Sequence, residues 1–192
     1  MDTYFYKIIR PFISFLFKIL FRPVVLGIEN IPSSGGVILA GNHTKWLDPI
    51  ALIAINKRQV HFLCKDELFH GITKPIVKAM GCISVNRKIH DKEALSLGYK
   101  TLEKNNVIGI FPEGTINRSS DIVMPFKIGA VKMAGKTNSY LVPFTITGKY
   151  KLFKKSIKIE FLKPYKIKDS KTLDDENKKL MHIISENLQK NI

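Results

Sequence analysis

The sequence predicts one α/β domain, in which helices flank a mostly buried mixed sheet and an amphipathic helix precedes the domain. The chain has 192 residues, a length that suits a single domain with a sizeable core. Hydrophobic residues make up 45% of it, which is typical of a globular protein and not of a disordered one. Short apolar runs alternate with segments of helical periodicity, and this alternation favours the α/β class.

The first segment, residues 4–22, is rich in Phe, Ile and Leu but also carries basic residues. At about 100° per residue, Ser14 and the cations fall within an arc of roughly 120°; the cations are Lys7, Arg10, Lys18 and Arg22. The longest uncharged run, residues 11–17, is far shorter than the ~20 residues that span a bilayer. We expect a helix that lies in a membrane interface and is kinked or restarted at Pro11. Packing on the domain's own core is the alternative, and one helix can do part of each.

The elements that follow are predicted in chain order. Turn-rich residues 30–36 lead to the apolar run 37–40, a short buried strand. A helix is expected over residues 48–55, because Asp is favoured at an N-cap and Pro at the first helical position. We divide the chain into a membrane-associating segment, residues 1–26, and a folded domain, residues 27–192.

The rest of the chain continues the alternation. Residues 91–104 have helical periodicity with acidic residues near the start, as the helix dipole favours. The other expected elements are strands at 59–64, 82–86, 107–111, 140–147 and 157–162, and helices at 73–80, 127–136 and 172–191.

The chain is strongly basic. It has 31 Lys and Arg against 16 Asp and Glu, a net charge of +15, which implies an anionic partner such as nucleic acid or an anionic membrane. Residues 151–168 contribute many lysines and one acid, Glu160. The two cysteines, Cys64 and Cys82, lie in apolar runs without metal-ligand spacing, so we expect free thiols in a reducing compartment.

A candidate catalytic pair follows the first buried strand. His43 comes just after the strand and Asp48 opens the next helix, so the short loop between them brings an imidazole close to a carboxylate. If the carboxylate binds one ring nitrogen, the other can take a proton from a hydroxyl group. The alternative is that Asp48 only caps its helix and His43 is an ordinary surface histidine.

Candidate anion-binding residues lie at the ends of other predicted strands. Glu113-Gly114-Thr115 forms a glycine turn whose N–H groups and hydroxyl could hold a phosphate. We expect Glu113 to bind an acceptor hydroxyl or orient cations. Three cations are expected at the same rim: Lys65, Arg87 and Arg118.

Two motifs together resemble the glycerolipid acyltransferase family, in particular its 1-acylglycerol-3-phosphate (lysophosphatidate) acyltransferases. They are Asn42-His43 followed, after four intervening residues, by Asp48, and Phe111-Pro112-Glu113-Gly114-Thr115. The resemblance covers residues 27–148 and implies a His–Asp dyad, with direct attack of the acceptor hydroxyl on a thioester. The resemblance also implies that the strand ending in Arg87 binds the acyl acceptor. Lys65 and Val142-Pro143 match two further motifs of the family.

Two positions depart from the family pattern. Lys45 stands where many members have Ser, and Ile116 stands where a phosphate-binding Arg is common. Arg118, two residues on, is the expected substitute.

The leading functional hypothesis is transfer of a fatty acyl group to 1-acylglycerol 3-phosphate, which gives phosphatidic acid. The donor is expected to be an acyl carrier protein or coenzyme A thioester, with no metal or further cofactor. We expect a peripheral or monotopic protein at the cytoplasmic face of the cell membrane. Glycerol 3-phosphate or another lysolipid is the alternative acceptor. A non-catalytic basic module is a distant alternative, but no nucleic-acid-binding motif occurs, so a nucleic-acid partner is not expected.

Overall fold

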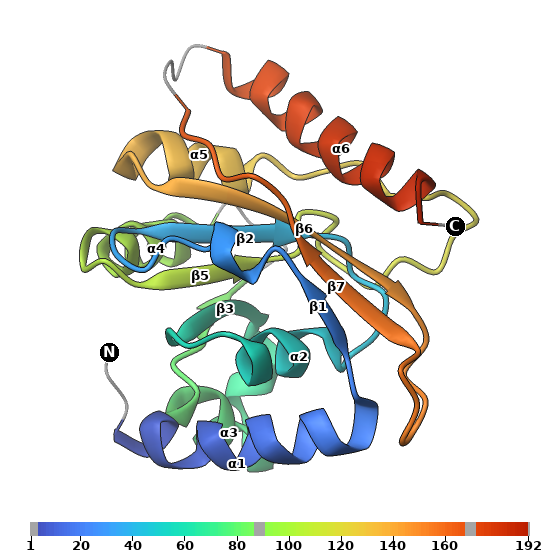
Figure 1. The fold of residues 1–192 in the computed structure, drawn as a ribbon. Coiled ribbons are helices and arrows are strands. Elements are labelled where there is room, and N and C mark those ends of the chain that lie inside the picture. Colours follow the sequence, from blue (N-terminus) through green and yellow to red (C-terminus); the bar gives the residue numbers. More distant parts are fainter. Residues whose placement is uncertain (1–3, 87–90, 168–171, 192) are drawn as a thin grey trace.

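The computed structural model describes residues 4–86, 91–167 and 172–191, and within them seven strands form one mixed sheet (Figure 1). The strand order is β1-β7-β6-β2-β5-β3-β4. The strands are β1 Val24–Leu26, β2 Val37–Gly41, β3 Val60–Lys65, β4 Ile83–Val85, β5 Val107–Ile110, β6 Tyr140–Gly148 and β7 Ile157–Phe161. The helices are α1 Tyr4–Phe21, α2 Asp48–Ile55, α3 Lys74–Ala79, α4 Lys92–Glu103, α5 Gly129–Thr137 and α6 Leu173–Gln189. Short 3-10 turns are η1 Ile28–Asn30, η2 Asp66–Phe69 and η3 Gly71–Thr73.

Strand direction determines where a site can form. β2 pairs in parallel with β5 and β6, and β3 pairs in parallel with β5 and β4, so the carboxyl ends of these five strands share one edge. β7 returns antiparallel to β6, and β1 runs parallel to β7. Residues that follow β2, β3, β5 and β6 therefore meet at one edge of the sheet. The predicted α/β class with a mixed sheet is confirmed.

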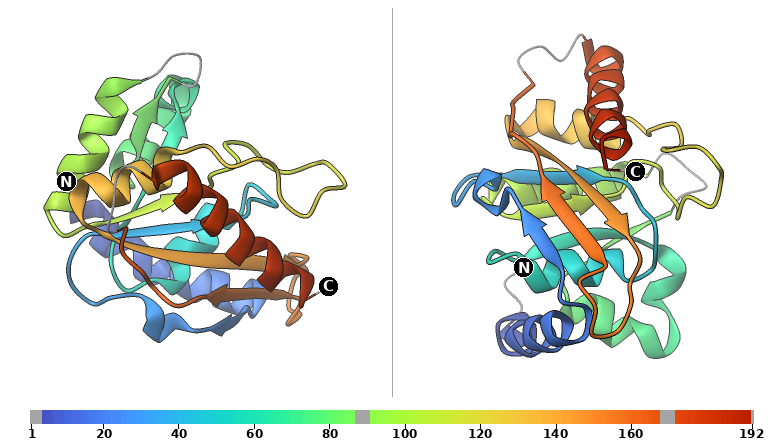
Figure 2. Two further views of the ribbon diagram at one scale, coloured as in Figure 1. Left: turned by 90° about the horizontal axis from the view of Figure 1, so that it is seen from above. Right: turned by 45° about the vertical axis from the view of Figure 1, so that its right-hand side comes forward.

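Two hydrophobic cores lie on the two faces of this sheet. Side chains alternate along β2, so Val37 and Leu39 face one core while Ile38 and Ala40 face the other. The first core contains residues of α1 and α2, and the second contains residues of α4, α5 and α6. Figures 1 and 2 show the same three layers, with α1 and α2 on one side and α5 and α6 on the other. All five β2 residues are buried, as a central strand requires.

The helix predicted over residues 4–22 forms as α1, but its faces differ from the expectation. α1 runs as one helix through Pro11, so the predicted restart at Pro11 is wrong. A proline removes one hydrogen bond, and burial of residues such as Phe17 against the core compensates for this loss. Ser14, expected in the polar arc, is buried and donates to the Ala54 carbonyl of α2 at 2.6 Å. Arg10 is also half-buried, so the cations do not form one solvent-facing stripe.

A second face of α1 remains exposed and apolar. It carries Phe5, Ile8, Phe12, Phe15, Leu16 and Ile19. Across the described residues, no helix combines the length and the apolar character needed to cross a bilayer. One face of α1 therefore packs on the domain's own core, as the alternative prediction stated. The opposite face is apolar and has no partner among the described residues.

Smaller features complete the comparison with the sequence. The three-residue strand β1 was not predicted, and it lies within residues 1–26 although it pairs with β7, so the sheet begins before residue 27. Asp91 caps α4, where its carboxylate accepts from the Ala94 N–H at 2.9 Å. Cys64 and Cys82 are free thiols, as expected.

Candidate active site

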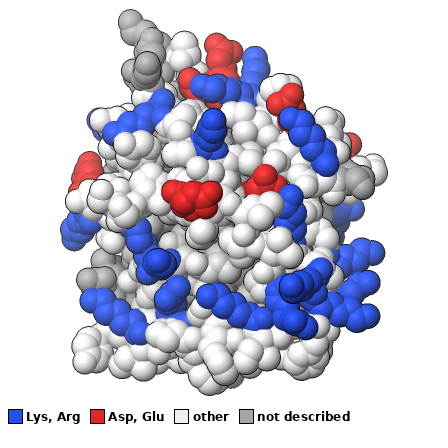
Figure 3. All heavy atoms as spheres, in the orientation of Figure 1, with Lys and Arg blue, Asp and Glu red and all other residues white. Residues whose placement is uncertain are grey.

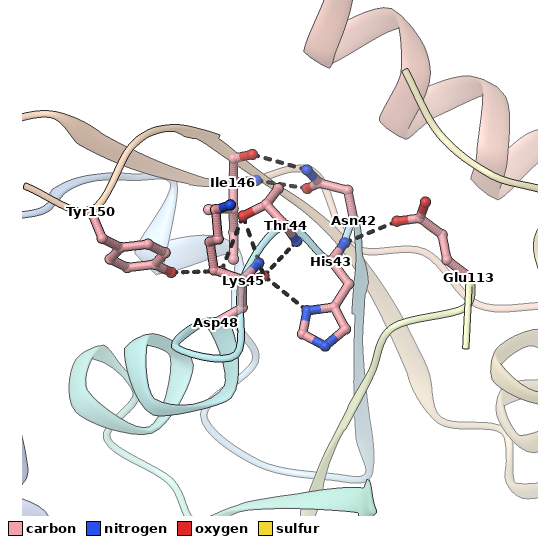
Figure 4. A network of polar contacts seen from close by, with 8 residues as sticks. All are labelled: Asn42, His43, Thr44, Lys45, Asp48, Glu113, Ile146 and Tyr150. Carbon is pink, nitrogen blue, oxygen red and sulfur yellow. Dashed lines mark hydrogen bonds and ion pairs between the residues drawn. The ribbon is translucent and has the colours of Figure 1, made fainter. Parts of the chain in front are cut away.

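The candidate site begins where β2 ends. Asn42 is buried, and its side-chain amide donates to the Ile146 carbonyl at 2.9 Å while its oxygen accepts from the Ile146 N–H at 2.8 Å. These two hydrogen bonds extend the pairing of β2 with β6 by one step, with the Asn42 side chain in place of a backbone group. Figure 4 shows how it holds the backbone from which His43 projects.

His43 and Asp48 lie in direct contact, as predicted from their spacing. His43 Nδ1 is 2.9 Å from Asp48 Oδ2, with side-chain exposures of 16% and 0%. An ionised carboxylate only accepts hydrogen bonds, so a neutral imidazole bonded to it carries its hydrogen on Nδ1 and a lone pair on Nε2. Figure 4 shows the second ring nitrogen turned away from the carboxylate.

Four further groups donate to Asp48. The Thr44 and Lys45 N–H groups donate to Oδ2 at 2.6 and 2.8 Å, and the Tyr150 hydroxyl donates to Oδ1 at 2.7 Å. The Thr44 hydroxyl lies farther away, at 3.3 Å from Oδ1. α2 starts at Asp48 with Leu47 at its N-cap, so the carboxylate reaches back into the loop and does not cap the helix. The helix-cap alternative to a His–Asp pair is therefore wrong.

Tyr150 was not foreseen from the sequence. Burial first, then the charge of Asp48, raises the pKa of the Tyr150 phenol well above its usual value, so the hydroxyl stays protonated and donates. Its ring packs edge-on against two α1 side chains, Phe17 and Phe21, at centroid distances of 6.2 and 5.5 Å. One tyrosine therefore connects α1 to the carboxylate of the pair.

The plane of the His43 ring is set by Phe111, the residue after β5. The two rings stack with centroids 4.1 Å apart and an angle of 16° between their planes. Phe111 is itself held by Phe62 and Phe144, with both centroid distances 6.0 Å. The imidazole thus has a fixed orientation from its hydrogen bond and its stacking together.

Glu113 lies behind His43 and is buried, with 4% exposure. Its two oxygens accept from the His43 N–H and the Met124 N–H, each at 2.9 Å. The Asn117 N–H also donates to the His43 carbonyl at 2.8 Å. Glu113 thus joins the loop after β5 to the histidine backbone, whereas the sequence had suggested contact with an acceptor hydroxyl or with cations.

A cavity of about 980 Å³ opens in front of His43 at this edge of the sheet. Among the predicted site residues, His43, Lys65, Gly114, Thr115 and Arg118 line it. Asp48 and Glu113 stand behind this lining, and Arg87 lies outside the described residues. Much of the lining is apolar, including Trp46, Phe62, Leu68, Leu95, Ile116 and Met133. Within the described ranges, no group of three or more His, Cys, Asp or Glu residues could hold a metal ion.

Lys127 lines the cavity and is the second residue, after Tyr150, that sequence reasoning missed. Gly114 has a φ of 75°, and a Cβ added there would lie 2.9 Å from Lys127 Nζ, so the glycine turn makes room for the ammonium group. The Lys127 N–H donates to the Pro112 carbonyl at 2.8 Å, which ties this lysine to the turn. Lys132 also lines the cavity. Lys127 differs from the many other lysines in its contact with the Gly114 turn. No sequence pattern predicts this contact.

The chain is similar in sequence to known acyltransferases. A family model described as Acyltransferase matches residues 22–147. A 1-acyl-sn-glycerol-3-phosphate acyltransferase of Borreliella burgdorferi is 36% identical over 137 residues, which cover 70% of this chain and 54% of the relative. The protein of the same name from Bacillus subtilis is 34% identical over 122 residues, which cover 62% of this chain and 60% of the relative. The matched part therefore spans a little more than half the length of these curated relatives.

A solved structure has the same fold. The crystal structure of the 1-acyl-sn-glycerophosphate (LPA) acyltransferase, PlsC, from Thermotoga maritima matches with a TM-score of 0.75 and 20% identity. The match covers 96% of this chain and 79% of that chain, so the layers and the sheet described above are shared almost throughout.

Proposed function

Because the chain belongs to the acyltransferase family, we propose that it transfers a fatty acyl group from a thioester to the free hydroxyl of 1-acylglycerol 3-phosphate. The observation that carries the proposal is the His43–Asp48 pair, 2.9 Å apart, at a largely apolar cavity that also contains cations. Two curated relatives, 36% and 34% identical to this chain where they match, bear the name of this activity.

His43 is the general base in the proposed reaction. Nε2 takes the proton of the acceptor hydroxyl while the hydroxyl oxygen attacks the thioester carbonyl carbon. The C–S bond then breaks, and the imidazolium returns its proton to the leaving thiolate. Asp48 stabilises the imidazolium through Nδ1–H, and the Thr44 and Lys45 N–H groups hold its carboxylate in place. No covalent enzyme intermediate is required.

Acceptor binding follows from the charges around the cavity. Lys65, Arg118 and Lys127 line it together with the Gly114–Thr115 turn. A phosphate monoester next to this turn would meet the Lys127 ammonium group directly, and Arg118 adds a second cation. Lys127 thereby compensates for Ile116, which occupies the position where an arginine was expected. The apolar part of the same cavity suits acyl chains.

Membrane association is proposed through the exposed face of α1. Figure 3 shows an uncharged lower edge, where α1 lies in Figure 1, beneath a row of Lys and Arg side chains. Exposed apolar side chains below a band of cations suit an anionic bilayer surface, with acyl chains below and headgroups at the band. We place the protein at the cytoplasmic leaflet, as a peripheral or monotopic protein, because the thioester donors, coenzyme A or acyl carrier protein, are cytoplasmic.

The α1 proposal can be tested without disturbing its packed face. Deletion of residues 1–22 would also remove buried Tyr6 and Phe17, so substitutions on the exposed face are preferable. A variant with Phe12, Phe15 and Ile19 changed to Ser should lose most of its sedimentation with anionic vesicles. Leu97→Ser, on α4 across the sheet, is the matched control. Unchanged sedimentation of the triple variant would exclude α1 as the anchor.

One assay tests the proposed activity. Purified protein is incubated with labelled acyl-coenzyme A or acyl carrier protein and, separately, with 1-acylglycerol 3-phosphate, glycerol 3-phosphate or a phosphate-free lysolipid. We expect product with the first acceptor. Product with glycerol 3-phosphate or another lysolipid alone would keep the chemistry and change the acceptor. Absence of transfer to every acceptor would refute the proposal.

A further inference from the structure

The loop that joins β6 to β7, residues 149–156, has an exposed tip that the proposed reaction does not use. Leu152 and Phe153 are 58% and 60% exposed. Lysines surround them at positions 149, 151, 154 and 155, all exposed, and the loop contains no acidic residue. Two large apolar side chains at the end of a basic loop gain nothing from the domain's own core, which points to an external partner.

The tip is held against the end of α1. The Phe153 N–H donates to the Leu20 carbonyl, one of the last α1 carbonyls that lack a partner within the helix. Phe153 has a φ of 59°, a left-handed conformation that is unfavourable for a bulky side chain. This conformation lets the loop reach α1 while the Phe153 ring stays exposed.

The tip and the exposed face of α1 lie at the same end of the molecule. Figure 1 shows the β6–β7 hairpin descending to the level of α1, and the right-hand view of Figure 2 shows the same arrangement. The Tyr150 ring, packed against Phe17 and Phe21, closes the junction between them. The loop tip therefore lies beside the C-terminal end of α1.

We propose that residues 149–155 are a second membrane-contact element, which inserts Leu152 and Phe153 into an anionic bilayer while the flanking lysines meet the headgroups. The inference rests on the proposed membrane association of α1. Charge supports an anionic surface, since each lysine near such a surface raises binding about fivefold at low salt. The position of the loop beside α1 (Figure 1) favours a bilayer over an acidic protein, because a bilayer surface can contact both elements at once.

The test is vesicle binding of the full chain, measured by co-sedimentation without substrate. Leu152→Ser combined with Phe153→Asn removes the apolar tip, and Asn tolerates the left-handed conformation of position 153. We expect at least about a tenfold loss of binding to vesicles that contain an anionic phospholipid. Leu97→Ser, an exposed leucine on α4, should bind as wild type does.

A second variant separates charge from burial. With Lys151, Lys154 and Lys155 changed to Gln, binding to anionic vesicles should fall roughly a hundredfold at low salt, about fivefold for each lysine, while binding to neutral vesicles stays the same. If both variants bind anionic vesicles as wild type does, the proposal is overturned. It is also overturned if the lysine variant loses only its affinity for an acidic acyl carrier protein. Because sedimentation needs no turnover, failure here is distinct from failure of the proposed acyl transfer.

A separate observation, the hydrogen bond from Tyr150 to Asp48, carries a second inference. We infer that Tyr150 is a positioning residue, which holds the carboxylate of the dyad from the membrane-facing side of the domain. It donates to Oδ1 at 2.7 Å, on the opposite oxygen from His43. The inference presupposes the proposed dyad chemistry.

Tyr150→Phe removes only the hydroxyl and keeps the ring against Phe17 and Phe21. We expect kcat to fall about tenfold and the unfolding midpoint to fall as well, because a buried carboxylate loses a hydrogen bond, with both KM values and vesicle binding unchanged. Tyr140→Phe, a second half-buried tyrosine far from the dyad, is the control. Unchanged kcat in active Tyr150→Phe would overturn the inference. A wild-type enzyme without acyl transfer would instead refute the proposed function itself.

Discussion

Glu113→Gln tests whether the second motif acts on substrate or on the protein backbone. Both Glu113 oxygens accept from backbone N–H groups at 2.9 Å, and the residue is 4% exposed. An amide keeps one acceptor and turns an NH₂ group toward the other N–H. One charge-assisted hydrogen bond, roughly 1.5–3 kcal/mol, is lost and a buried donor is left without a partner.

We therefore expect the free energy of unfolding of Glu113→Gln to fall by about 2–4 kcal/mol. At roughly 2–4 °C per kcal/mol for a domain of this size, Tm should fall by about 5–15 °C. Because the His43 backbone loses its support, kcat should fall also, while the acceptor KM stays close to that of wild type. Urea unfolding and steady-state kinetics at a temperature well below the transition measure the two effects.

Glu103→Gln, at an exposed position near the end of α4, is the matched control and should leave both quantities unchanged. The reasoning is refuted if Glu113→Gln unfolds as wild type does but has a raised acceptor KM. That result would assign Glu113 to the acceptor hydroxyl, the role that the sequence had suggested.

The other predictions concern single groups around the same edge of the sheet. Asn42→Ala should lower the free energy of unfolding by about 2–3 kcal/mol, because it leaves a backbone N–H and a carbonyl of β6 without partners; an unchanged urea midpoint would contradict this. Lys127→Met should raise the KM for 1-acylglycerol 3-phosphate about tenfold or more, with the thioester KM unchanged and Lys136→Met behaving as wild type. Arg118→Ala should raise the acceptor KM more than the donor KM; if neither variant alters the acceptor KM, the phosphate is held elsewhere.

Much of the fold follows from local sequence patterns. The apolar run 37–40 and the Asp48-Pro49 pair are enough to predict β2 and α2 and a short loop between them. That loop brings His43 to Asp48 because it is too short to place them apart. Helical periodicity and acidic residues near the start likewise predict α4, although not that Asp91 would be its cap.

The remaining parts of the site depend on distant segments. The Glu113–His43 bond spans 70 positions and the Tyr150–Asp48 bond spans 102, and both require the order of the strands in the sheet. The helical wheel of residues 4–22 shows which side chains share a face of α1. It does not show which face packs against the rest of the domain. Ser14 and Arg10 were therefore placed in the polar arc of the helix, although they lie on the packed side. β1 is too short to show a pattern of its own.

The central claim is that His43 is the base for acyl transfer, and turnover of purified His43→Ala tests it most directly. The variant is assayed with the thioester and acceptor that wild type uses, beside His70→Ala, whose side chain is 72% exposed. Since general-base catalysis contributes roughly 10²–10⁴-fold, we predict that kcat falls by that factor in His43→Ala, with the unfolding midpoint and vesicle binding retained. Turnover of folded His43→Ala within a few-fold of wild type would contradict the account.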